Sequence, residues 1–213
     1  MNRFLIASVA VAAVAACTQA QAATALTDGN FAAAPDPGVY KTYYANSTFG
    51  GWTVGKTGSV DLIGSYWANP PGSRSVDLDG ESPGSISQML NLVSGKTYKL
   101  SFKLSGNPDG GDTTKGVGVT VGGDPAQLFT YDTAAHGTTK ADMKWVSESF
   151  SFTATSGTEL LTFASTDAGS AYGAVIAGVA VPEPATWAMM LIGFGGLGAA
   201  LRMNRRRIAA VTA

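Results

Sequence analysis

The chain has 213 residues, of which 14% are charged, and its formal net charge is -1. Between Ala23 and Val181, nine Lys and Arg residues stand against fourteen Asp and Glu residues. An acidic region of this kind repels phosphate backbones, which argues against nucleic acid as a partner. The single cysteine, Cys17, lies near the N-terminus. The region after it therefore has no disulfide and depends on packing for its stability.

Residues 1–22 predict a secretory signal peptide. A short basic start is followed by an uncharged run from Phe4 to Ala16, which is too short for a membrane span of roughly 20 residues. Ala20-Gln21-Ala22 then fits a cleavage site before Ala23. One alternative stays open, because Val14-Ala15-Ala16-Cys17 resembles a lipobox, whose cysteine is acylated and becomes the new N-terminus.

Residues 23–181 predict one all-β domain. Apolar and polar residues alternate in several segments, which is typical of strands with one buried face. Turn clusters rich in Gly, Pro and Asn separate these segments, and no stretch before Pro182 has a helical period. We therefore predict an antiparallel sandwich of about eight strands. The strand segments are 60–63, 75–78, 86–92, 98–104, 117–121, 149–154, 160–164 and 175–181.

Residues 182–207 combine three features of a membrane-dependent signal. Pro182-Glu183-Pro184 breaks the last strand and favours an extended, accessible peptide. Residues 185–201 carry no charge and would span ~25 Å as a helix, just enough for a bilayer core. The arginine-rich segment 202–207 follows, and positive charge stays on the cytoplasmic side. This order predicts a domain outside the cell and a cytoplasmic tail at 208–213.

The same order, from Val181 to Arg207, resembles the PEP-CTERM sorting signal of Gram-negative bacteria. The resemblance implies that the protein crosses the inner membrane, is held there transiently and is processed by an exosortase. It also implies that cleavage falls near Pro182-Glu183-Pro184, with release or transfer to the cell surface. A plain single-pass anchor is the alternative interpretation.

A series of motifs in the domain also follows a known order. They are Asp28-Gly29-Asn30-Phe31, Trp52-Thr53-Val54, Tyr66-Trp67, Gly84-Ser85-Ile86-Ser87-Gln88, Gly95-Lys96-Thr97-Tyr98 and Phe150-Ser151-Phe152-Thr153-Ala154. The series resembles the choice-of-anchor C family, which is related to the DUF642 group of surface proteins. The resemblance extends from about Thr27 to Val181 and implies a galactose-binding-like jelly-roll sandwich associated with polysaccharide contact. The Leu-Asp-Asn-Val-like closing strand of such domains is replaced here by Ile176-Ala177-Gly178-Val179, which lacks the polar pair.

Aromatic residues with polar neighbours indicate carbohydrate binding, because a ring offers a flat apolar face and Arg or Asp takes the hydroxyls. Trp52 and Trp145 have the alternative role of core anchors. Tyr66 and Trp67 would point to opposite faces of an extended segment, so one of them is expected to be exposed. The candidates are Trp52, Tyr66, Trp67, Arg74 and Trp145, together with Tyr40, Tyr43 and Tyr44.

Calcium is a candidate structural cofactor, since it takes six to eight oxygen ligands from carboxylates and loop carbonyls. Asn107, Asp109 and Asp112 cluster in a Gly-rich loop, and Asp77 with Asp79 forms a second group. The alternative is ordinary turn formation by Asn and Asp side chains. Neither group has the regular spacing of an EF-hand.

The sequence offers little for catalysis. His136 is the only histidine and lies in a Gly/Thr-rich loop without an evident triad. Asp77, Asp79 and three glutamates (Glu81, Glu148 and Glu159) could serve glycoside hydrolysis, but spacing alone does not pair them. We therefore predict a non-enzymatic, exported module bound to extracellular polysaccharide, for example in a biofilm. A protein-binding structural or adhesive module and, after it, a glycoside hydrolase are the alternatives.

Overall fold

The computed structural model describes residues 25–169, 171–182, 196 and 202. The predicted signal peptide and nearly all of the predicted sorting signal after Pro182 lie outside these residues. No helix within the described residues is long and apolar enough to cross a membrane.

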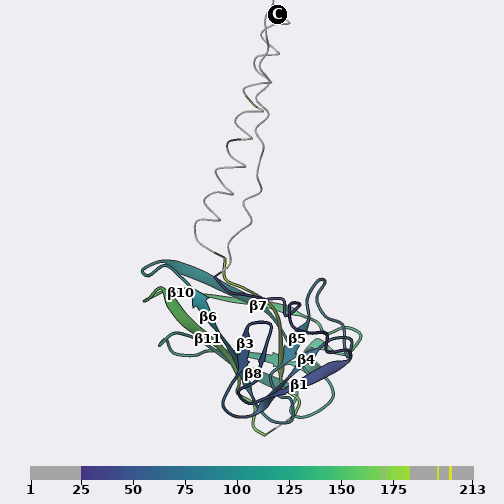
Figure 1. The fold of residues 1–213 in the computed structure, drawn as a ribbon. Helices are drawn as coiled ribbons and strands as arrows, with labels where there is room; N and C mark the ends of the chain where they lie inside the picture. Colours follow the sequence, from purple (N-terminus) through teal and green to yellow (C-terminus); the bar gives the residue numbers. More distant parts are fainter. Residues whose placement is uncertain (1–24, 170, 183–195, 197–201, 203–213) are drawn as a thin grey trace, which may run out of the picture.

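The described chain folds into two antiparallel sheets that pack face to face (Figure 1). The first sheet has the strand order β1-β4-β5-β12-β7-β10, and the second has the order β2-β3-β6-β11-β8-β9. The chain passes from one sheet to the other at nearly every step from β5 to β12, which is the pattern of a jelly roll. The predicted all-β sandwich is confirmed. The strands are β1 (Tyr40–Tyr44), β2 (Thr48–Phe49), β3 (Trp52–Val54), β4 (Ser59–Ile63), β5 (Ser75–Asp77), β6 (Ser85–Asn91), β7 (Thr97–Gly106), β8 (Thr114–Val121), β9 (Gln127–Asp132), β10 (Val146–Thr153), β11 (Thr158–Ser165) and β12 (Ala174–Ala180).

The main core lies between the sheets and consists of the inward-facing residues of the alternating strands. Trp52 and Phe163 meet edge to face with ring centroids 6.2 Å apart, and Phe102 meets Phe163 at 5.2 Å. All three side chains are buried. Edge-to-face pairs of this kind add to the free energy gained from burying the rings. This aromatic centre supplies stability that no disulfide provides in the described chain.

The outer face of the first sheet is covered as well. Ile63 and Val175 point outward from β4 and β12, and Trp67 and Met143 cover them from the loops that follow β4 and α1 (Thr133–His136). These four buried residues form a second, smaller group, called the outer cluster below. Because both faces of β12 are buried, its sequence reads as a continuous apolar run rather than an alternation.

Four strands and one helical turn were not predicted. The edge strands β1 and β9 carry several exposed residues, with Leu128 of β9 as much as 72% exposed, so their sequences do not alternate cleanly. The strands β2 and β3 are only two and three residues long. The single turn α1 is held by Asp132, whose carboxylate accepts hydrogen bonds from the backbone of Ala134 and Ala135.

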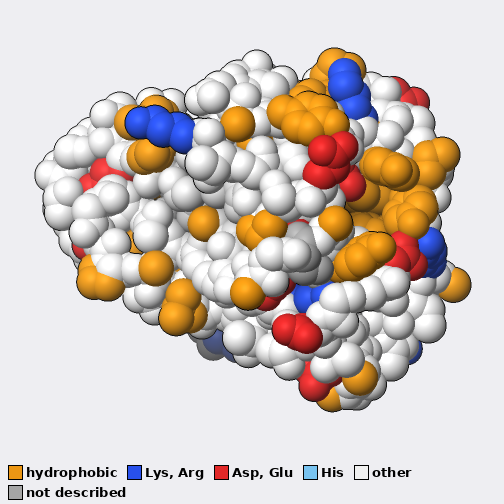
Figure 2. Space-filling model, turned by 90° about the horizontal axis from the view of Figure 1, so that it is seen from below, with side chains coloured by type: hydrophobic (Ala, Val, Ile, Leu, Met, Phe, Trp, Pro, Cys, Tyr) orange, Lys and Arg blue, Asp and Glu red, His pale blue; other side chains and the backbone are white. Residues whose placement is uncertain are grey.

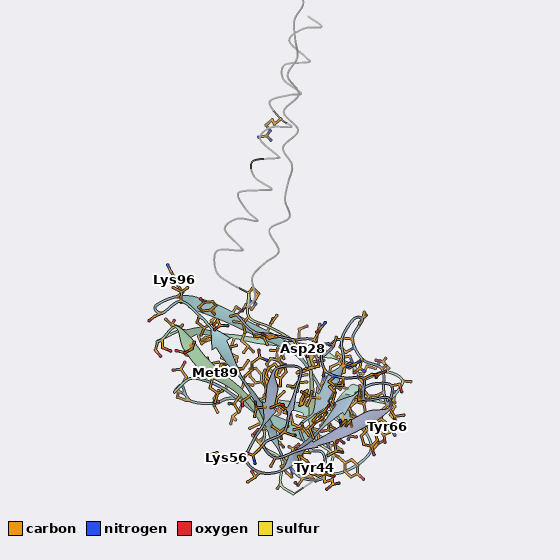
Figure 3. The ribbon with its side chains drawn as sticks, in the orientation of Figure 1. Asp28, Tyr44, Lys56, Tyr66, Met89 and Lys96 are labelled. Carbon is orange, nitrogen blue, oxygen red and sulfur yellow. The ribbon has the colours of Figure 1, made fainter. Side chains whose placement is uncertain are left out.

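The first and last described segments of the domain lie side by side. The backbone N–H of Ala25 donates to the carbonyl of Val181 at 3.2 Å. Both segments lie toward the upper edge of the sandwich in Figure 1, whereas Tyr44 and Tyr66 lie at the lower right in Figure 3. The edge formed by β1 and β4 is therefore well separated from the point where the chain leaves the domain.

Candidate functional site

A cavity of about 240 Å³ opens on the outer face of the first sheet, near the edge formed by β1 and β4. In Figure 2 hydrophobic side chains gather toward the right, the side on which β1 and β4 lie in Figure 1, with acidic and basic groups among them. The cavity is smaller than most small-molecule sites, which suits a ligand no larger than one sugar ring. It is lined by Tyr40, Asp61, Ile63, Tyr66, Trp67, Asp77, Gly80, Asn107, Asp109, Ala171 and Tyr172.

Strand register places two aspartates at the floor of the cavity. Thr42 of β1 lies opposite Asp61 of β4, and Asp61 lies opposite Asp77 of β5. The chain neighbours of Asp61 (Val60 and Leu62) and those of Asp77 (Val76 and Leu78) belong to the main core. The two aspartates therefore occupy the outer face by the period of two. Burial is the main cause that raises the pKa of Asp61, and nearby Glu81 raises it further, although the Thr42 side chain opposes the shift.

Tyr66 forms one wall of the cavity and is held by two charged groups. Its hydroxyl donates to Asp109 Oδ2 at 2.6 Å and accepts from Lys140 Nζ at 2.8 Å. Lys140 Nζ also lies 2.9 Å from Asp109 Oδ2 and 4.0 Å from the centre of the Tyr66 ring. Burial alone would raise the pKa of Asp109, but the bonds from Tyr66 and Lys140 lower it overall. The edge-to-face contact with Tyr40, at 5.3 Å, completes this wall.

Asn107 connects this wall to the floor. Its amide donates to Asp77 Oδ2 at 2.7 Å, and its carbonyl oxygen accepts from the backbone of Asp109 at 2.9 Å. Asp77 Oδ1 accepts from the backbone N–H groups of Asp79 and Gly173. Asp77 is 1% exposed, and burial raises its pKa well above the usual value in spite of these bonds. Its position is therefore fixed by three donors.

The predicted calcium ligands are engaged with protein groups. The side-chain nitrogen and oxygen of Asn107 each have a hydrogen-bond partner, and Asp109 forms an ion pair with Lys140. Asp112 is exposed. Among the described residues, no three or more His, Cys, Asp or Glu side chains are arranged to hold a metal ion. As they stand, these residues do not offer the six to eight free oxygens that calcium takes. Calcium binding stays a prediction from sequence.

A buried charged network lies next to the cavity floor. Lys115 is 1% exposed, and its Nζ donates to the backbone carbonyls of Gly110 and Tyr172 at 2.7 and 2.5 Å. Asp167 accepts from the backbone of Gly116 at 2.7 Å, and burial raises its pKa. Burial also lowers the pKa of Lys115, although Asp167 and three other aspartates oppose that shift. The lysine is the cation that faces this group of carboxylates.

Asp79 is the least satisfied member of this network. Its side chain is 0% exposed, and neither carboxylate oxygen has a hydrogen-bond partner of good geometry among the described residues. Burial raises its pKa to about 6, the proximity of Asp167 adds to the shift, and Ser165 and Lys115 oppose it. Gly173 packs directly on it, because a Cβ at that position would lie 2.5 Å from Asp79 Cγ.

The aromatic candidates separate into cavity residues and core residues. Tyr66 and Trp67 line the cavity, although the Trp67 indole is mostly buried and donates to Ser75 Oγ at 2.9 Å. Trp52 is 0% exposed in the main core, so its indole offers no face to a ligand. Trp145 packs on the outer cluster and donates to the carbonyl of Ala68. Tyr66 is half-buried and Trp67 is buried, so neither is exposed as the sequence led us to expect, and Tyr66 is the more accessible of the two.

Arg74 has a structural role in the described chain. Its Nη1 donates to the carbonyls of Ala34 and Pro35, and its Nη2 lies 3.7 Å from Asp36. It thereby holds the segment before β1 rather than facing the cavity. Of the early tyrosines, Tyr40 lines the cavity, Tyr43 is buried, and Tyr44 is exposed with its hydroxyl donating to Glu81.

The residues considered for catalysis do not meet at one place. Glu159 accepts three hydrogen bonds from Thr155 and Ser156 in the turn before β11. His136 is exposed in α1, where its ring stacks on Tyr131 at 4.4 Å between centroids. Of this set, Asp77 alone lines the cavity.

Three polar or aromatic residues of the site were not predicted: Asp61 and Tyr172 line the cavity, and Lys140 bonds to the wall residues Tyr66 and Asp109. Asp61, Tyr172 and Lys140 come from β4, the loop before β12 and the loop after α1. One signal was available for Asp61, because Ser-Val-Asp-Leu occurs at 59–62 and again at 75–78. Tyr172 and Lys140 have no such signal, because loop conformation alone brings them to the cavity.

The outer face of the second sheet forms a different kind of surface. Register aligns Thr48, Thr53, Ser87, Thr162 and Thr120 in one row across five strands. Thr48 and Thr53 are exposed, and the other three are half-buried. Such a row of hydroxyls is flat and uncharged, in contrast to the acidic cavity on the first sheet.

Comparison with known proteins gives one curated relative and solved structures of carbohydrate-binding modules. Halomucin of Haloquadratum walsbyi is 36% identical over 148 residues, which cover 68% of this chain but only 2% of that protein. A family 35 carbohydrate-binding module from Clostridium thermocellum has a TM-score of 0.45 at 18% identity, covering 68% of this chain and 98% of that one. A CBM35 module from Paenibacillus barcinonensis has a TM-score of 0.43 at 17% identity, with coverages of 66% and 97%.

Two family models match the chain itself. The model described as "Protein of unknown function (DUF642)" matches residues 24–182, and the PEP-CTERM protein-sorting motif matches residues 180–207. The DUF642 relationship and the PEP-CTERM resemblance inferred from sequence motifs are thereby confirmed, and the choice-of-anchor C resemblance is compatible with the DUF642 match. The chain belongs to the DUF642 family and carries a C-terminal PEP-CTERM sorting motif.

Proposed function

We propose that this protein is an exported, non-catalytic glycan-binding module that an exosortase processes and delivers to the cell surface or the extracellular matrix. The cavity on the first sheet carries the proposal. Tyr40, Tyr66 and Tyr172 give it aromatic walls, and Asp61 and Asn107 place polar groups near its floor. A sugar ring uses both, since its apolar face packs on aromatic rings and its hydroxyls bond to carboxylates and amides.

The cavity is also well placed for a ligand outside the cell. The domain ends at Val181, beside Ala25, at the upper edge of the sandwich in Figure 1. The cavity residue Tyr66 lies at the lower right edge in Figure 3. A membrane-held segment after Pro182 would therefore leave the cavity turned away from the membrane and open to polymers around the cell.

The geometry of the two floor aspartates supports binding rather than hydrolysis. Asp77 is almost fully buried and is held by three hydrogen bonds. A glycosidase needs one carboxyl to protonate the leaving oxygen and a second to act as nucleophile or base, and both must reach the substrate. Asp77 reaches the cavity only as a fixed part of its floor, so glycoside hydrolysis is the weaker proposal.

Replacement of Tyr66 tests the glycan-binding proposal. We expect Tyr66→Ala to weaken binding to the host's own exopolysaccharide about 10- to 30-fold. The substitution removes one aromatic wall of the cavity and the hydroxyl that bonds to both Asp109 and Lys140. Tyr66→Phe keeps the ring and is expected to retain most of the binding. Affinity electrophoresis in gels that contain the polysaccharide measures the change.

Leu128→Ala provides the control for this test. Leu128 is 72% exposed on β9 in the second sheet, away from the cavity, and its loss is expected to leave binding unchanged. Equal binding by wild-type protein and Tyr66→Ala would show that the glycan does not use this cavity.

The sorting motif predicts a second, independent result. In the native host, we expect the intact mass of the mature protein to lack the residues that follow Pro182-Glu183-Pro184. Replacing Glu183 with alanine is expected to leave the chain uncut and in the membrane fraction, because it removes the glutamate of the sorting motif that the exosortase would recognise. Wild-type protein that ends at Ala213 would contradict exosortase processing.

A protein-binding adhesive module is the second candidate. One observation favours it: Met89 and Leu160 lie opposite each other on the second sheet and are 51% and 44% exposed. An exposed apolar pair is a modest contact surface and suits a weak, repeated interaction. Loss of surface retention in a Met89→Ser variant, with glycan binding intact, would favour this alternative.

A further inference from the structure

The cavity floor has an unusual charge arrangement that follows from a sequence repeat. Ser59-Val60-Asp61-Leu62 on β4 and Ser75-Val76-Asp77-Leu78 on and after β5 are identical tetrapeptides. The antiparallel register sets Asp61 directly opposite Asp77. Like charges at directly opposed positions of an antiparallel pair destabilise the sheet. A cation bound at the cavity floor would offset the repulsion between the two aspartates.

Among the described residues, the lysines nearest the cavity form no ion pair with Asp61 or Asp77. Lys140 Nζ is engaged with Asp109 and the Tyr66 hydroxyl at the cavity wall. Lys115 Nζ donates to the carbonyls of Gly110 and Tyr172. Asp77 is satisfied by neutral donors, and Asp61 Oδ1 is buried without a hydrogen-bond partner among the described residues. The floor therefore presents two opposed carboxyl groups to which neither lysine ammonium is bonded.

The walls and size of the cavity show what kind of cation fits. Tyr40, Tyr66 and Tyr172 line it, and the faces of aromatic rings attract cations. Aromatic rings do not ligate calcium or magnesium, which take oxygen ligands. A cavity of about 240 Å³ is also far larger than a single ion needs. A ligand that consists of one ring with an ammonium group fits this cavity, because its ring can pack on the tyrosine walls and its ammonium group can bind the floor aspartates.

We propose that this cavity selects a sugar residue with a free, unacetylated amino group, placing its ammonium over Asp61 and Asp77 and its ring against Tyr66. The inference rests on the proposed glycan-binding function and specifies the class of sugar. N-acetylated sugars of the same shape lack the charge, and uronic acids bring a carboxylate that the floor repels. The partner is thus a cationic, amino-sugar polysaccharide.

Calorimetric titration of the purified full-length protein compares three probes: oligomers of β-1,4-linked glucosamine, of β-1,4-linked N-acetylglucosamine, and of galacturonate. Slightly below neutral pH, where amines are charged, we expect the glucosamine oligomer to bind at least about tenfold more tightly than the acetylated one. Galacturonate is expected not to bind. Raising the salt concentration should weaken glucosamine binding and leave N-acetylglucosamine binding unchanged, since salt screens charge attraction.

Two variants link the preference to the floor. Asp61→Asn is nearly isosteric and is expected to equalise the affinities for the glucosamine and N-acetylglucosamine oligomers. Asp124→Asn makes the same charge change on an exposed residue of the turn between β8 and β9, and is expected to keep the preference. If Asp61→Asn does not fold, the salt dependence of the wild-type protein decides the question instead.

The outcomes separate this inference from the function on which it rests. Equal binding of charged and acetylated oligomers, or tighter binding of galacturonate, would overturn the amino-sugar preference while leaving glycan binding intact. Failure of every glycan, the host exopolysaccharide included, would overturn the proposed function itself. A preference for glucosamine that survives Asp61→Asn would show that the floor does not cause it.

Discussion

Replacing Lys115 with methionine is expected to lower the free energy of unfolding by about 3–5 kcal/mol at neutral pH. Lys115 is 1% exposed and lies among carboxylates of the buried network, including Asp79 and Asp167. Methionine fills a similar volume but leaves those carboxylates without their cation. It also leaves the carbonyls of Gly110 and Tyr172 without the donor that now holds the loop before β12 against the cavity.

Urea unfolding followed by tryptophan fluorescence measures this change. The difference in unfolding free energy between wild type and Lys115→Met should become smaller as the pH is lowered, because protonated carboxyl groups carry no charge for Lys115 to stabilise. Lys56→Met is the matched control, since Lys56 is exposed and is expected to change stability by less than about 0.5 kcal/mol. A Lys115→Met protein as stable as wild type at neutral pH would show that the buried network does not depend on the lysine.

Replacing Asp79 with asparagine is expected to stabilise the protein at neutral pH by up to about 3 kcal/mol. The figure follows from the difference between the usual carboxyl pKa of 3.8 and the value of about 6 that burial imposes on Asp79. Ionising Asp79 in the folded state is costly because its side chain is 0% exposed. Asparagine has nearly the same shape, carries no charge and brings a donor toward Ser165 and Asp167.

The pH dependence of this effect has a definite sign. Well below pH 3.8 the Asp79 carboxyl is protonated in both folded and unfolded chains, so its charge no longer distinguishes the stabilities of the two proteins. As the pH rises, the unfolded chain ionises first, and the wild type loses stability relative to Asp79→Asn until the pH passes about 6. Thermal unfolding of both proteins across this range tests the prediction, and a constant difference at every pH would contradict it.

The strands with a clear period of two were predictable from sequence alone. Tyr98, Leu100, Phe102 and Leu104 alternate with polar residues and lie on β7 with every one of them buried. The strands without that signal were missed, because β1 is an edge strand whose five residues include three tyrosines and only one buried side chain. Edge strands have one neighbour and more solvent contact, so their sequences carry less of the alternation that core strands require.

The site was only partly predictable for a related reason. Tyr66 could be identified as an aromatic residue with polar neighbours, and the structure places it in the cavity wall. Trp52 has the same chemistry but a position at the centre of the main core, and sequence does not separate the two environments. Asp61 gains its role from standing opposite Asp77, which depends on strand register and hence on turn geometry.

Glycan binding in the cavity is tested most directly by a crystal structure of the protein with a bound oligosaccharide of the host polysaccharide. We predict one sugar residue in the cavity on the first sheet, with its ring against Tyr66 and its polar groups within hydrogen-bond distance of Asp61. An oligosaccharide bound along the hydroxyl row of Thr53, Ser87 and Thr162 on the second sheet, with the cavity empty, would contradict it.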